Sequence, residues 1–194
     1  NRPEAEKFWL RTWITKYLKK FLGAHEKGEK RVGWQEYIWS WLGAFLGILF
    51  VALLHYRVLT RHALQFLIGS FGASAVLIYG APTSPLAQPR NLIGGHVLSA
   101  LVGCIVRVIL VKHERSVACA LAVAFAIVVM QITKTTHPPG GATALIAVTG
   151  EPALPWGNFL YILMPVLTGA TLMLIVALIV NNIAPKRIYP TRWW

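Results

Sequence analysis

The segment THPPGGATALIAVTG, residues 136–150, combines residue types that could bind a small anion inside a membrane. Pro138 and Pro139 have no N–H groups, so they suit the first turn of a helix, where such donors lack partners. Gly140 and Gly141 allow the backbone to approach a ligand closely. The N–H groups that follow, together with the hydroxyl of Thr143, could hold an anion at the start of a helix.

A second segment repeats this pattern. GASAVLIYG at 72–80 matches GATALIAVTG at 141–150, so Gly72 and Ser74 are the counterparts of Gly141 and Thr143. Each segment lies between two long apolar runs, and the chain therefore divides into halves at about 35–111 and 112–181. Small residues are common at helix contacts in membranes, so a chance match is the alternative. Repeated halves with interrupted helices are typical of transporters, whose sites lie between the repeats.

Four ionisable residues lie near these segments. His96 follows two glycines, and His137 precedes the Pro-Pro-Gly-Gly turn. Imidazole titrates near neutral pH, so either could neutralise an anion or relay a proton; the alternative is a hydrogen-bonded helix contact. Lys134 is either a cavity cation or the end of a span. Arg107 either faces a cavity or extends toward the membrane interface.

No enzyme signature is present. The chain has no Asp, and its seven Glu residues form no pair suited to acid–base chemistry. Cys104 and Cys119 lie in apolar runs without metal-ligand spacing. We therefore expect no catalytic residues, no metal and no cofactor. The lack of acids within the apolar runs also argues against a metal-cation transporter.

The composition indicates an integral membrane protein. The hydrophobic fraction is 56% and the charged fraction 13%, about half of what soluble domains carry. The net charge of +12 does not indicate nucleic-acid binding, because nine of the nineteen Lys and Arg precede the first long apolar run. That distribution fits contact with anionic lipid.

The apolar pattern predicts an all-α membrane protein with four long transmembrane helices and two shorter Gly/Pro-broken segments in a twofold repeat. The long spans are expected at about 37–54, 92–111, 117–132 and 159–180, and the short segments at 64–80 and 138–149. Residues 1–32 form a basic amphipathic helix, at 3–22, and a linker; residues 33–194 form the transmembrane domain. Charge leaves two topologies open: six crossings with inverted halves, or four crossings with parallel halves.

Several strings resemble the HPP family of integral membrane proteins. They are IGSFGASAVLIYGAPTSPLAQPRNLIGGHVLSALVG at 68–103, HPPGGATALIAV at 137–148, and the C-terminal NN followed by YP-x-x-WW. The resemblance covers about residues 33–194. The resemblance implies a helical membrane domain. Plant chloroplast and cyanobacterial members of the family are associated with nitrite transport. The resemblance also supports a role for His96, which lies in one of these strings.

Two functions remain as alternatives. The first is transport of a small inorganic anion, nitrite-like, through a site between the two Gly-rich segments. The second is an accessory subunit of a larger membrane complex, docked through the N-terminal helix. A transporter should have a hydrated path reaching Gly72 and Gly141, whereas a structural subunit should pack that region dry. The expected partners are the anion and the bilayer; a homo-oligomer, a larger complex, and the choice between organellar and plasma membrane stay open.

Overall fold

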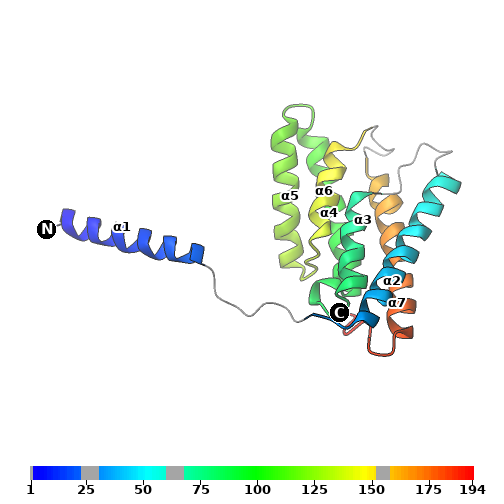
Figure 1. Ribbon diagram of the computed structural model, residues 1–194. Coiled ribbons are helices and arrows are strands. Elements are labelled where there is room, and N and C mark those ends of the chain that lie inside the picture. The colour runs from blue at the N-terminus through cyan, green and yellow to red at the C-terminus, as the bar shows by residue number, and fades with distance from the viewer. Residues whose placement is uncertain (1, 23–30, 60–67, 152–157) are drawn as a thin grey trace. The chain divides into compact units, whose positions relative to one another are not determined.

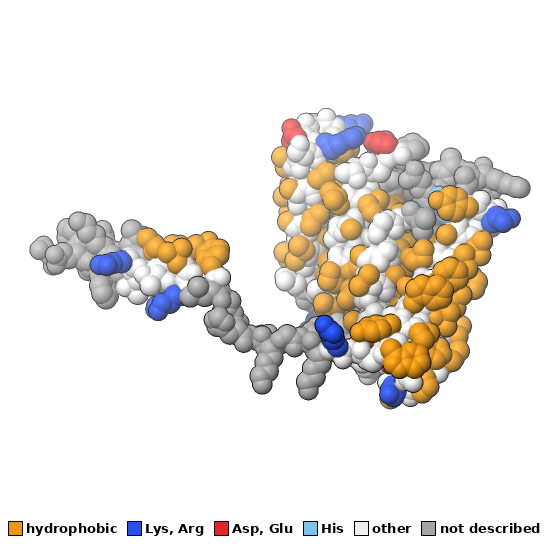
Figure 2. Space-filling view, viewed as in Figure 1, with side chains coloured by type: hydrophobic (Ala, Val, Ile, Leu, Met, Phe, Trp, Pro, Cys, Tyr) orange, Lys and Arg blue, Asp and Glu red, His pale blue; other side chains and the backbone are white. Residues whose placement is uncertain are grey.

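The computed structural model describes residues 2–22, 31–59, 68–151 and 158–194. The chain divides into two compact units, Asn1–Val32 and Gly33–Trp194. The first unit is helix α1 (Arg2–Lys19), extended by a 3-10 turn, η1 (Lys20–Leu22). Trp13, Tyr17 and Phe21 follow each other at four-residue spacing, and their rings lie 5.4 and 5.2 Å apart in an exposed row. Figure 2 shows hydrophobic side chains gathered on one side of α1. Such a helix suits a membrane interface.

The second unit contains, within the described residues, four helices long and apolar enough to cross a membrane. They are α2 (Trp34–Leu53), which continues as the π-helix η2 (Leu54–Leu59); α4 (Pro89–Leu110); α5 (Arg115–Ile132); and η6 (Ile162–Leu167), which continues into α7 (Thr168–Ile183). Two shorter apolar helices are α3 (Gly69–Ala75), extended by η4 (Val76–Gly80), and α6 (Pro139–Thr149). The predicted fold class is confirmed, although residues 64–67 of the second predicted segment lie outside the described part.

The short helices connect opposite ends of the long ones. In Figure 1, α2 and α4 rise from the end that carries the C terminus, whereas α5 and α7 descend toward it. In chain order, α3 follows α2 and descends, and α6 follows α5 and rises; α6 packs against α4 and α5. The helix directions of the two halves are therefore inverted, as in the first of the two topologies, although only four of the described helices are long enough to cross a membrane.

Glycines let the helices of this unit approach closely. A Cβ added at Gly43 would lie 2.6 Å from the ring of Tyr79, and one at Gly103 would lie 2.5 Å from the carbonyl oxygen of Ala144. These glycines seat η4 on α2 and α6 on α4, as small residues do between membrane helices. Outside these contacts the surface is apolar. Figure 2 shows hydrophobic side chains over the visible face and Lys and Arg toward its two ends, as a bilayer requires.

Candidate functional site

The two short helices meet at the imidazole of His96, on α4. Ser74 on α3 places its Oγ 2.7 Å from His96 Nε2, and Thr143 on α6 places its Oγ1 2.7 Å from His96 Nδ1. Ser74 and Thr143 occupy equivalent positions in the two repeats. The inverted halves therefore contribute one hydroxyl each to the two nitrogens of one histidine.

Two further side chains complete this polar cluster, which consists of Ser70, Ser74, His96, His137 and Thr143. His137 Nε2 lies 2.9 Å from Ser74 Oγ, and His137 Nδ1 donates to the Leu86 carbonyl at 2.9 Å. Ser70 Oγ lies 3.0 Å from Thr143 Oγ1. The imidazoles of His96 and His137 are 5.0 Å apart between ring centroids. The structure thus brings together Ser74, His96, His137 and Thr143, which the sequence singled out separately.

The polar cluster is sealed from solvent. Its members have no exposed surface, except for 1% of Ser70. Polar side chains within a membrane bundle are costly, and they mark substrate or proton pathways or structural hydrogen bonds. Here each polar side-chain atom has a partner; among the described side chains, Ser99 Oγ is the one buried polar atom without one. The cluster contains hydroxyls and imidazoles and no carboxylate, so it can offer hydrogen-bond donors to an anion.

Close backbone packing closes the cluster from the side of α4. A Cβ at Gly95 would lie 2.5 Å from the Cβ of His137. A Cβ at Gly140 would lie 2.8 Å from the Gly95 carbonyl oxygen and from Ser99 Oγ. Gly95 and Gly140 therefore set the distance between α4 and the start of α6, and with it the position of His137.

The other candidate residues lie elsewhere. Gly72 is exposed, and a Cβ there would meet no atom within 4 Å. Gly141 is half-buried beside Val123 and lines an apolar pocket between α5 and α6. The N–H groups of Gly140 and Gly141 donate to the carbonyls of His137 and Pro138, so they are occupied in this conformation.

Arg107 lies at the opposite end of α6 from the polar cluster. Its guanidinium donates to the carbonyls of Ala147, Val148 and Gly150 and pairs with Glu151 at 3.2 Å. The last carbonyls of a helix lack partners within the helix, and here a buried arginine supplies the donors. This contact makes Arg107 a helix cap, a role that the sequence interpretation did not consider.

Three cations surround a pocket at the end of the unit where α4 begins. This cationic pocket has a volume of about 180 Å³ and is lined by Gln88, Arg90, Asn91, Lys134, Arg192, Trp193 and Trp194. None of these residues is acidic. Lys134, which the sequence left as either a cavity cation or the end of a span, lies here beside Arg90 and Arg192. The backbone N–H of Thr191 donates to Gln88 Oε1, which holds the C-terminal segment against the pocket.

Lys134 has a left-handed backbone conformation, with φ of 56°. It ends α5, and the next N–H, of Thr135, donates back to the Met130 carbonyl at 2.9 Å. Glycine usually occupies such a position, since other residues pay about 1 kcal/mol or more for it. A lysine at this strained position is consistent with a role for its ammonium group in the cationic pocket.

The loop from Thr133 to His137 links the cationic pocket to the polar cluster. Arg90 Nη2 donates to the Thr133 carbonyl at 2.6 Å, and Asn91 Nδ2 donates to the Thr136 carbonyl at 2.8 Å. His137 follows Thr136 directly, and its acceptor, Leu86, lies two residues before Gln88. The pocket and the cluster are therefore neighbouring layers of the same region.

Sequence reasoning did not single out Ser70 or Arg192. Ser70 lies one helical turn before Ser74, and that spacing was a usable signal, because residues four apart share a helix face. Nothing in the sequence indicated that Arg192, in the C-terminal tail, returns to the start of α4.

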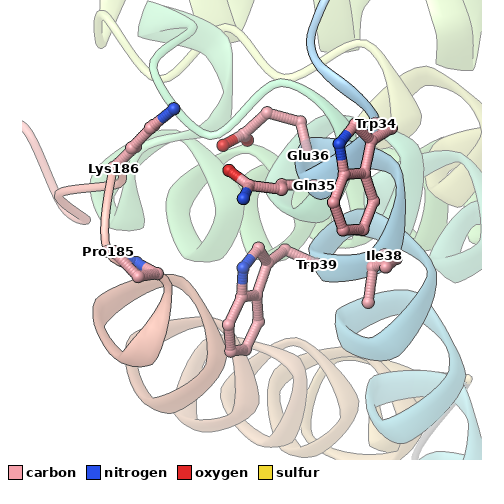
Figure 3. Close-up of a pocket in the computed structure, with 7 residues that line it drawn as sticks. All are labelled: Trp34, Gln35, Glu36, Ile38, Trp39, Pro185 and Lys186. Carbon is pink, nitrogen blue, oxygen red and sulfur yellow. The ribbon is translucent and has the colours of Figure 1, made fainter.

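A separate surface pocket lies where α2 begins and α7 ends. Figure 3 shows Trp34 and Ile38 on one side of it, Pro185 and Lys186 on the other, and Trp39 between them. The neighbouring Arg187 holds the two elements together, because its Nε donates to Glu36 at 2.7 Å and its Nη1 to the Tyr79 carbonyl at 2.9 Å. We therefore interpret this pocket as part of a structural junction that Arg187 holds together, and not as a binding site.

Comparison with known proteins identifies the family. Residues 29–190 match the family described as HPP, transmembrane region. Two transmembrane proteins of Dictyostelium discoideum are similar: one is 55% identical over 187 residues, covering 95% of this chain and 60% of its own length. The other is 52% identical over 190 residues, covering 96% of this chain and 66% of its own length, so the chain spans less than two thirds of both relatives. No solved structure matches the chain. The chain belongs to the HPP transmembrane family.

Proposed function

We propose that this chain transports a small inorganic anion, nitrite-like, across a membrane. The observation that carries the proposal is the cationic pocket, with Arg90, Lys134 and Arg192 around it, next to a buried cluster of hydroxyls and imidazoles. Charges of one sign in a pocket with low-dielectric walls raise the local concentration of the opposite ion. The absence of carboxylates from the lining and from the cluster makes an anion the fitting ligand.

In this proposal the anion first exchanges part of its hydration for the cations of the pocket. It then passes His137 into the polar cluster, where Ser74 and Thr143 can donate to it. The described conformation is closed between pocket and cluster, so it corresponds to an occluded state. Passage requires α6 and the loop before it to move relative to α4, as repeat halves move in alternating access.

The test is anion uptake by liposomes that contain the purified chain, comparing nitrite, nitrate, formate and chloride. Arg90→Gln and Lys134→Gln remove charge from the cationic pocket and should raise the concentration for half-maximal uptake. Lys186→Gln is the matched control, because Lys186 lines the separate pocket of Figure 3. Equal effects of all three variants would indicate general surface charge and contradict a specific entrance.

The second candidate is an accessory subunit of a membrane complex. Two observations favour it: the polar side chains between α3 and α6 are buried and hydrogen-bonded to one another, and α1 exposes an aromatic row that could dock on another protein. This candidate predicts that deleting residues 1–32 abolishes co-purification of a partner. Anion transport by the Gly33–Trp194 unit predicts that uptake persists without those residues.

A further inference from the structure

The hydrogen bonds of the polar cluster fix one direction of donation when both imidazoles are neutral. The argument starts at His137, whose Nδ1 lies 2.9 Å from the Leu86 carbonyl oxygen. A carbonyl oxygen only accepts, so Nδ1 carries the proton. Nε2 of a neutral His137 is therefore an acceptor, and Ser74, 2.9 Å away, donates its hydroxyl proton to it.

The direction then passes to His96. Ser74 has a single hydroxyl proton, so its contact of 2.7 Å with His96 Nε2 requires His96 to donate from that nitrogen. Nδ1 of His96 becomes an acceptor, and Thr143 donates to it at 2.7 Å. Ser70 Oγ lies 3.0 Å from Thr143 Oγ1 and can accept from it, so Ser70 is a second acceptor for the same hydroxyl proton.

The result is a continuous chain of donors from Thr143 through His96 and Ser74 to His137. Each hydroxyl can receive a proton and release one at its oxygen. Each imidazole can receive a proton at one ring nitrogen and release one from the other. Ser74 Oγ also lies 3.1 Å from the Ser70 carbonyl, and Thr143 Oγ1 lies 3.3 Å from the Pro139 carbonyl. These carbonyls are acceptors to which the two hydroxyls can turn after a proton has passed.

We propose that this ordered chain of hydrogen bonds carries a proton from Thr143 to His137, so that the anion moves together with a proton. The coupling rests on the proposed transport function, whereas the proton path stands on the geometry alone. One monovalent anion paired with one proton makes the transport electroneutral.

The step balances as follows. When the Thr143 end opens to water, a hydronium ion gives a proton to Thr143 Oγ1. Thr143 passes its own proton to His96 Nδ1, and His96 releases the proton of Nε2 to Ser74. Ser74 gives its proton to His137 Nε2, which leaves His137 as an imidazolium with both nitrogens protonated. On the side of the cationic pocket the proton leaves to water with the anion, and the chain resets when His96 returns to its first tautomer.

The surroundings leave this charge without a buried counter-ion. Among the residues that the structure describes, the titratable groups near the two imidazoles, from α3, α4, α6, η6 and the loops at Leu86 and His137, are the imidazoles themselves and Tyr161. Tyr161 donates its hydroxyl to the Thr143 carbonyl at 3.2 Å, and Phe71 covers His96 edge to face. Among the described residues no carboxylate contacts the cluster. An imidazolium formed at His137 therefore pairs with an anion that arrives from the cationic pocket.

The first test is the tautomer of each histidine, read by 15N solid-state NMR of the whole chain in bilayers at neutral pH or above. His96→Gln and His137→Gln variants assign the signals. The expected result is opposite tautomers: the proton on Nε2 in His96 and on Nδ1 in His137. The same tautomer in both rings contradicts the ordered chain, whether or not the protein transports an anion.

The second test measures proton and nitrite entry into the same liposomes, with a pH dye inside. Ser74→Ala and Thr143→Val each remove one link while both histidines stay. Each should reduce proton entry at least tenfold, a lower bound on the roughly 10²–10⁴-fold that a positioned proton-transfer group contributes. Ser99→Ala is the matched control, since it removes a buried hydroxyl that has no partner and lies outside the chain. It should retain proton entry within twofold.

The outcomes separate the two proposals. Nitrite entry without protons, in the wild type, contradicts the proton path and leaves anion transport standing. Proton entry that depends on Ser74 but not on any anion supports the path and contradicts anion transport. Equal proton entry in Ser74→Ala and Ser99→Ala contradicts the path.

Discussion

Gly140 sets the contact between α4 and α6, and Gly140→Ala tests whether that contact holds the polar cluster closed. The added Cβ would lie 2.8 Å from the Gly95 carbonyl oxygen and 3.0 Å from Met130 Sδ. Ordinary contact begins at 3.4 Å, so α6 must move away from α4 by about 0.6 Å. Backbone cannot give way as a flexible side chain can. Overpacking of this kind lowers the free energy of unfolding by about 1–3 kcal/mol. Up to about 1 kcal/mol of this is offset, because alanine is more favourable than glycine in a helix.

Gly141→Ala is the matched control. It makes the same chemical change at the next position, where the nearest atom to an added Cβ is Val123 Cγ1 at 3.9 Å. Only the helix preference remains there, so we expect unchanged or slightly raised stability. The displacement in Gly140→Ala also lengthens the bonds of His137, whose position depends on the same contact.

The assay is thermal unfolding in detergent, followed by 15N NMR of the histidines. Gly140→Ala should unfold at a lower temperature than both the wild type and Gly141→Ala, and its His137 signals should shift. If the two alanine variants unfold at the same temperature and leave His137 unchanged, the close contact between α4 and α6 is refuted.

Three further variants test other contacts. Lys134→Gly should raise the unfolding temperature, because glycine relieves about 1 kcal/mol of left-handed strain. It should also raise the anion concentration for half-maximal uptake. A higher unfolding temperature with an unchanged concentration for half-maximal uptake would show that Lys134 is not part of the entrance. Arg107→Met leaves the last carbonyls of α6 without donors and should lower the free energy of unfolding by about 1–3 kcal/mol. Uptake per folded molecule should stay within twofold of the wild type. A loss of uptake would show that Arg107 belongs to the transport site. Glu36→Ala leaves the buried guanidinium of Arg187 without its carboxylate and should cost about 1–3 kcal/mol, whereas an unchanged unfolding temperature would show that the ion pair contributes little.

The long helices could be predicted from the sequence because their signal is local. About 20 apolar residues suffice to recognise a span, and α4 and α5 begin within three residues of the predicted positions. The start of α6 was also predictable, since Pro139 fits the first turn of a helix. Matching segments in the two halves predicted the repeat, and the alternation of helix directions, which charge left undecided, emerged from the structure.

The site was predictable only in its members. Ser74, His96 and His137 were recognised as polar residues in apolar surroundings. In the sequence, however, Ser74 is 22 residues from His96 and 63 residues from His137, although it is hydrogen-bonded to both. Which nitrogen meets which hydroxyl depends on packing set by Gly95 and Gly140. Gly72 was chosen because it matches Gly141, yet it lies two residues from Ser74, on another side of α3. A motif match gives the position in the repeat and does not give the direction of the side chain.

The most direct test of the transport claim is the initial rate of nitrite uptake into liposomes, measured across nitrite concentrations for the wild type, His137→Gln and Ser99→Ala. The account predicts saturable uptake in the wild type and in Ser99→Ala. It predicts a loss of at least tenfold in His137→Gln, a lower bound on the roughly 10²–10⁴-fold that a positioned proton-transfer group contributes. Folding is checked in each case by thermal unfolding. Well-folded wild type that moves neither nitrite nor nitrate, formate or chloride would contradict the account and favour the accessory-subunit function.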